Sequence, residues 1–109
     1  MTPFIARHGD LFIRQISELP SGLKAQENTV LAYGEATNHS HQLVQGQACV
    51  YSATGSDTEG KKYFEVTSKG GAKLVHQEHK TIDIPQGQYE VLNEKELNPF
   101  DEAVRRVQD

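Results

Sequence analysis

Histidine is the residue type in this sequence best placed to do chemistry, because four of the five histidines lie in two short clusters. His39 and His41 stand one residue apart in "NHSH", and His76 and His79 bracket "HQEH". In an extended strand, residues i and i+2 point to the same side about 6.6 Å apart, so two imidazoles can hold one metal ion at about 2.0 to 2.1 Å from each nitrogen. The sequence therefore predicts a two-histidine clamp at His39 and His41.

His76, Glu78 and His79 are the candidates to complete this site. On a regular strand His76 and Glu78 face the same side, so His76 is expected as a third ligand and Glu78 as a fourth ligand or a general base. His79 faces the other side and joins only if residues 77–80 bulge or turn. Three nitrogens with an open position suit catalytic Zn²⁺, whereas two histidines with a carboxylate favour Fe(II) or Mn²⁺.

The expected cofactor is thus a divalent transition metal, Zn, Mn or Fe. Imidazole binds metal only when it is neutral, so the affinity should fall below the unperturbed histidine pKa of about 6.5.

Two other reactive side chains are interpreted as structural. His8, in "ARHGD", is expected on the surface before the first strand, and its replacement by alanine is expected to leave metal binding intact. Cys49 is the only cysteine, so no internal disulfide and no thiolate cluster can form, and its place between Ala48 and Val50 favours the core over a nucleophile. The sequence contains no GxSxG, P-loop, GxGxxG or HExxH motif, which removes the simplest support for those enzyme classes.

The segments that must position these residues are typical of short antiparallel strands. β-Branched or aromatic residues with partial period-two alternation occur in residues 10–16, 29–36, 41–46, 48–54, 62–68, 72–78, 81–85 and 88–94. Turn residues separate these segments, and residues 19–28 are interpreted as a loop. We therefore expect an all-β fold, a small sandwich or barrel of seven to eight short strands.

Only the last segment changes period. Asn98 and Pro99 suit the start of a helix, and apolar residues recur at helical spacing after them, which predicts a short C-terminal helix laid on the sheet over residues 98–109. The predicted core comprises Leu11 or Phe12, Ile13, Val30, Leu43, Val50, Phe64, Val66, Leu74, Ile82, Ile84 and Val91.

Length and charge bound the kind of protein. At 109 residues the chain is expected to form a single β domain over residues 1–109. Its 15 acidic residues against 11 Lys and Arg give a formal charge of −4, which disfavours a nucleic-acid partner.

The N-terminus shows no basic start followed by an apolar run, and no window approaches the roughly 18 apolar residues of a membrane span, so we expect no membrane partner and a cytoplasmic protein. Pairing with a second copy would cover an exposed sheet edge, which favours a homodimer.

Part of the histidine pattern resembles the cupins, metal-binding β-proteins with an early HxH. Gly34 precedes "HSH" by about the cupin interval, and Pro85 to Gly87 resembles the PxG turn of the second cupin motif. After His41, however, no Glu stands where the cupin carboxylate belongs, and Glu90 occupies the position of the second motif's histidine. The similarity is weak and implies neither an oxygenase nor an isomerase.

Nearly the whole chain resembles an uncharacterised family of short bacterial and bacteriophage β-proteins. Its pattern is Gly-Glu-x-Thr-(Gly or Asn)-His-x-His, then His-x-Glu-His, then Pro-x-Gly-x-Tyr-x-Val, and residues 34–41, 76–79 and 85–91 fit it. Asn38 stands at the usual Gly position, and Asn tolerates positive φ best after Gly, so the same turn can form. The resemblance groups the four clustered histidines with Glu78 and implies no particular reaction.

Two classes of function remain open. The first is a small metal-dependent enzyme, a hydrolase in which the ion lowers the pKa of a bound water and Glu78 takes the proton. The second is a non-enzymatic bacterial or bacteriophage accessory or assembly module, in which the histidines are structural or hold a metal that ties loops together. Its support is size, because 109 residues leave little material for both a core and a walled substrate cleft.

Overall fold

The computed structural model describes residues 3–9, 11–33, 39–53 and 61–93. Within these ranges the chain forms ten strands and no helix. The strands are β1 (Ile5–His8), β2 (Leu11–Ile16), β3 (Leu23–Ala25), β4 (Val30–Tyr33), β5 (Ser40–Val44), β6 (Ala48–Ala53), β7 (Lys62–Val66), β8 (Ala72–Val75), β9 (Ile82–Ile84) and β10 (Gly87–Asn93). None of the described segments is a helix with the length and apolar character needed to cross a membrane.

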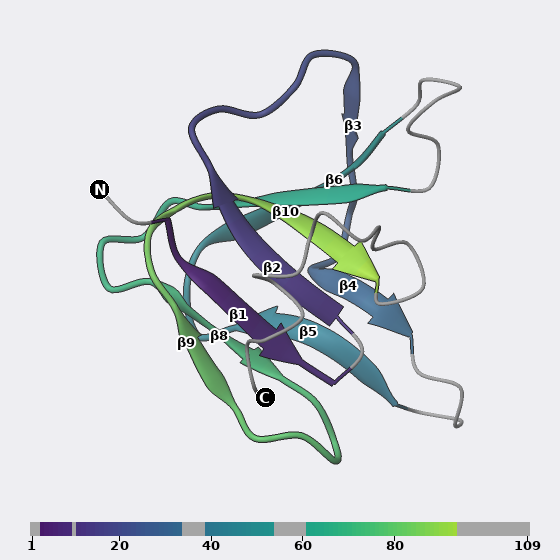
Figure 1. Cartoon of the computed structure of the whole chain (residues 1–109), viewed down its shortest axis with the longest axis vertical. Coiled ribbons are helices and arrows are strands. Elements are labelled where there is room, and N and C mark those ends of the chain that lie inside the picture. The colour runs from purple at the N-terminus through teal and green to yellow at the C-terminus, as the bar shows by residue number, and fades with distance from the viewer. Residues whose placement is uncertain (1–2, 10, 34–38, 54–60, 94–109) are drawn as a thin grey trace.

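The strands form two antiparallel sheets. One has six strands in the order β1-β2-β10-β7-β6-β3, and the other has four in the order β4-β5-β8-β9. The sheets lie against each other as an open sandwich (Figure 1), and in the described part of the chain neither sheet closes into a barrel. The last described strand, β10, is an interior strand that pairs with β2 on one side and β7 on the other.

The core lies between the two sheets and follows strand alternation. In β7, Phe64 and Val66 are 0% and 1% exposed and face the second sheet, where Leu43 and Leu74 pair with each other. The buried cluster between the sheets comprises Leu11, Ile13, Leu31, Leu43, Val50, Phe64, Val66, Ala72, Leu74, Ile84, Tyr89 and Val91. Removal of this apolar surface from water is the main term that holds the sheets together.

The all-β, antiparallel prediction is confirmed, and all eight predicted strands are present. Two further strands were missed: β1 precedes the first predicted strand, and β3 lies inside the predicted loop 19–28. The predicted core is confirmed except for Ile82, which is only partly buried against it. Cys49 is a correction, because it is only partly buried: alternation in β6 points Val50 inward and Cys49 to the opposite face. The predicted C-terminal helix, residues 98–109, lies outside the described residues.

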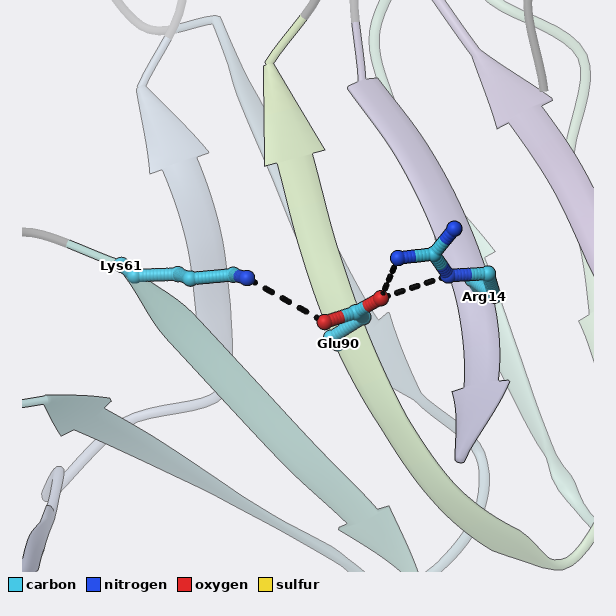
Figure 2. Close-up of polar contacts among 3 residues, drawn as sticks. All are labelled: Arg14, Lys61 and Glu90. Atoms are coloured by element: carbon cyan, nitrogen blue, oxygen red, sulfur yellow. Dashed lines mark hydrogen bonds and ion pairs between the residues drawn. The ribbon is translucent and has the colours of Figure 1, made fainter. Parts of the chain in front are cut away.

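The outer face of the six-stranded sheet carries a buried carboxylate. Glu90 on β10 is 8% exposed, and its register partner on β2 is Arg14. Nε of Arg14 donates to Oε1 of Glu90 at 2.5 Å, and Nζ of Lys61 lies 3.2 Å from Oε2 (Figure 2). The guanidinium also reaches Oε1 through a second nitrogen. Two cations on opposite sides thus compensate a charge that would be costly to bury alone.

Candidate functional site

All five histidines of the chain meet at one end of the sandwich. His8 comes from the six-stranded sheet, whereas the other four belong to β5, to the residue before it and to the segment after β8. The ring centroids lie 4.4 Å apart for His41–His76, 4.8 Å for His76–His79, 4.9 Å for His8–His41, 5.6 Å for His39–His76 and 5.7 Å for His8–His79. We call His8, His39, His41, His76 and His79 the histidine cluster.

The β5–β8 ladder explains why His41 meets His76. The outermost pair of this antiparallel ladder is Gln42 with Val75, so the next residues outward are His41 and His76. Their rings lie at an angle of 38°. The predicted convergence of these two histidines on one face is therefore a consequence of register.

The same spacing continues beyond the ladder. The Ser40 N–H donates to Oε1 of Gln77 at 2.9 Å, and Nδ1 of His39 lies 3.7 Å from Oε1 of Glu78. The Glu78 side chain is 66% exposed, so the carboxylate stands at the rim of the histidine cluster beside His39.

His8 is the main correction to the sequence prediction. It is 0% exposed, and β1 pairs with β2 so that His8 stands opposite Leu11 and faces the core. The chain turns at Gly9, which has φ of +64°. A Gly-Asp pair between two apolar-rich segments is a known hairpin signal, and the sequence "IARHGDLFI" carries it. That signal would have placed His8 on a strand rather than on the surface.

His8 joins the two sheets through hydrogen bonds. Its Nδ1 lies 2.8 Å from Nδ1 of His41, and its Nε2 lies 2.9 Å from the carbonyl oxygen of Lys80. His41 is 3% exposed, so this contact is shielded from water. The three residues form a continuous polar link across the end of an apolar core.

His79 enters the histidine cluster because residues 77–79 bend instead of extending β8. A bulge or turn in this segment is what the sequence pattern requires for His79 to join the site. The bend is held in part by the Glu78 N–H, which donates to Nδ1 of His76 at 3.0 Å. The His79 ring packs against Gly9: a methyl group on Gly9 would lie 2.7 Å from Nε2 of His79. A residue without a side chain is therefore needed at the β1–β2 turn.

The described residues contain no group of three His, Cys, Asp or Glu side chains already arranged around a metal position. Nδ1 of His76 accepts the Glu78 N–H, and Nδ1 of His41 is engaged with His8. Metal coordination would require the rings at the rim to turn about their side-chain torsions, which would bring nitrogens to the usual 2.0 to 2.1 Å from an ion.

A family model described as a domain of unknown function, DUF8820, matches residues 7–94. The chain belongs to the DUF8820 family. The DUF8820 match includes the whole histidine cluster and Glu78. No curated protein and no solved structure matches the chain. The DUF8820 description assigns no activity.

Proposed function

We propose that this chain is a small metal-binding β-protein whose histidine cluster holds one divalent transition metal. The observation that supports it is the convergence of five imidazoles from three separate segments at one end of a core that is otherwise apolar. Imidazole nitrogen is a preferred ligand of Zn, Cu, Fe and Ni, whereas Mn is better served by carboxylate and water.

The proposed ligands are His39, His41, His76 and His79. His41 is the most buried of them, and the other three are partly exposed, so an ion could reach them from the solvent. Four nitrogens would close a tetrahedral site, and three would leave one position for water.

The burial pattern supports a functional reading. Imidazoles replace apolar packing at the end of the sandwich, and the two buried ones, His8 and His41, are joined by a hydrogen bond there. Clusters of side chains that break the apolar pattern of a core occur mainly at functional sites. A metal bound by several imidazoles of the folded chain would stabilise the folded state.

In the enzymatic form of the proposal, a metal held by these histidines would supply an activated water, and Glu78 would accept a proton from that water. Its support is the position of Glu78 at the rim, with Oε1 3.7 Å from Nδ1 of His39. The reaction would then be a hydrolysis.

A structural role for the histidine cluster is the second candidate. The link from Lys80 through His8 to His41 joins the two sheets without any ion. In this alternative the chain is a non-enzymatic accessory or assembly module of a bacterium or bacteriophage.

Metal content tests the metal-binding proposal against a histidine cluster that is structural without an ion. Untagged protein, purified and then stripped with a chelator, should regain one Zn²⁺ per chain in a calorimetric titration and melt at a higher temperature with Zn²⁺. Single replacements of His39, His41 or His76 by Ala should abolish stoichiometric binding. Cys49→Ser is the control. Cys49 is the only cysteine of the chain and lies outside the histidine cluster, so this variant should bind Zn²⁺ as wild type does. No binding and no thermal shift with Zn²⁺, Mn²⁺ or Fe²⁺ would favour the structural role.

A further inference from the structure

We infer that His8 is a positioning residue that fixes the tautomer of His41 and so makes Nε2 of His41 the nitrogen that carries a lone pair for metal. The inference rests on the proposed function for its metal-binding part. Its geometric part concerns only His8, His41 and Lys80.

The tautomers follow from the hydrogen bonds. The carbonyl oxygen of Lys80 can only accept, so Nε2 of His8, 2.9 Å away, must donate and must carry a proton. A neutral imidazole has one N–H, which leaves Nδ1 of His8 as an acceptor. The 2.8 Å contact between the two Nδ1 atoms then requires that Nδ1 of His41 donates. In neutral His41 the lone pair therefore lies on Nε2.

Burial strengthens the two hydrogen bonds that fix the tautomers of His8 and His41. His8 and His41 are 0% and 3% exposed, so little water competes for their N–H groups. Hydrogen bonds are electrostatically stronger at low local dielectric, and an unpaired polar group is correspondingly costly there. The opposite tautomer of His41 would place two lone pairs against each other at this contact.

The arrangement matches the way proteins hold metal-binding histidines. Such a histidine usually donates its other N–H to a carboxylate, a carbonyl or a water, which fixes the ring and its tautomer. Here Nδ1 of His8 is the acceptor for the N–H of His41, and Nε2 of His8 in turn donates to the carbonyl oxygen of Lys80. Lys80 directly follows His79, so the same link ties β1 to the segment after β8 that carries the proposed ligands His76 and His79.

The test compares two replacements of His8. His8→Gln keeps an acceptor and a donor separated much as in imidazole, so it should preserve the Nδ1–H tautomer of His41 and bind Zn²⁺ within about threefold of wild type. His8→Leu fills a similar volume but has neither the hydrogen-bond acceptor nor the donor of the imidazole. Loss of such a partner of a metal ligand costs about 10- to 100-fold in metal affinity. The readouts are the ¹⁵N chemical shifts of the histidine rings at pH 8 in metal-free protein and the Zn²⁺ affinity from calorimetry.

Each outcome bears on a distinct claim. A wild-type spectrum with Nε2–H on His41, or a His8→Leu variant that binds Zn²⁺ as tightly as wild type, would overturn the inference. Wild-type protein that binds no Zn²⁺ overturns the proposed function and with it the ligand role of His41, whereas the spectrum of metal-free protein still decides the tautomer. The wild-type spectrum also carries the test if His8→Leu does not fold.

Discussion

Gly9 and His79 lie so close together that a methyl group on Gly9 would come 2.7 Å from Nε2 of His79, a separation that real Cβ atoms essentially never show. The same methyl group would lie 3.1 Å from Cε1 of His41. The β1–β2 turn is thus packed directly against the histidine cluster, and any side chain at Gly9 must displace a ring.

Gly9→Ala should destabilise the fold more than Gly22→Ala. Both glycines have positive φ, +64° and +79°, so both replacements carry a similar backbone cost of about 1 kcal/mol. A methyl group on Gly22 meets nothing within 4 Å, whereas the one on Gly9 adds overpacking of about 1 to 3 kcal/mol. Urea unfolding of both variants measures the difference. Equal losses of stability would show that the His79 ring moves aside without cost.

Metal selectivity should follow the all-nitrogen ligand set. The proposed ligands His39, His41, His76 and His79 are imidazoles, and among the described residues the carboxylate of Glu78 stands beside His39 at the exposed rim. Affinity should therefore rise from Mn²⁺ through Fe²⁺ and Co²⁺ to Ni²⁺ and Cu²⁺, with Zn²⁺ below Cu²⁺. Competition titrations with a chromogenic chelator give the order. Tighter binding of Mn²⁺ than of Zn²⁺ would point to carboxylate ligands instead.

Removal of Arg14 should cost more stability than removal of Lys61. Arg14 meets the buried Glu90 through two nitrogens, and Lys61 meets it through one at 3.2 Å. We expect Arg14→Met to lose about 1.5 to 3 kcal/mol, the range for hydrogen bonds to charged groups, and Lys61→Met to lose less. Lys73→Met is the control, because its ion pair with Asp83 is 42% and 82% exposed and should contribute almost nothing. Chemical denaturation checks this ranking, which equal losses for all three variants would contradict.

Tyr89 should make the fold less stable at high pH. Burial raises the pKa of Tyr89 to about 12 from an ordinary value of 10.0. The unfolded chain therefore loses the phenolic proton first, and stability falls as the pH rises from 10 to 12. At pH 11 the loss is about 1 kcal/mol, since one pKa unit corresponds to 1.36 kcal/mol. Tyr89→Phe removes this titration, so urea unfolding at pH 9 and pH 11 should show the stability advantage of wild type shrinking by that amount. If wild type and Tyr89→Phe differ in stability by the same amount at pH 9 and pH 11, the raised pKa of Tyr89 does not contribute to the pH dependence.

Alternation alone accounts for the part of the fold that the sequence predicted. Phe64 and Val66 face inward because they lie two residues apart on a strand, and the same rule placed His39 with His41. The missed strand β1 precedes the Gly-Asp hairpin signal at residues 9–10, and the missed strand β3 has three residues inside a segment whose Pro, Gly and Asn are typical of a loop.

The rest of the candidate site depends on pairing that no local pattern contains. His41 faces His76 because the ladder pairs Gln42 with Val75, and a shift of one residue would turn one of the two rings to the other face. The contact between His8 and His41 spans the two sheets, so it depends on how the sheets pack. Sequence reasoning could group histidines within each segment and could not place His8 among them.

The interior position of β10 has a consequence for the nascent chain. Until residues 87–93 have left the ribosome, β2 and β7 each lack a neighbour, and their backbone N–H and C=O groups form open edges. Open edges are templates for pairing with other chains. A sheet whose two halves are joined through β10, the last described strand, also depends on contacts between distant segments, which form slowly. Dilution and chaperones should therefore matter most in the interval before β10 is inserted between its two neighbours.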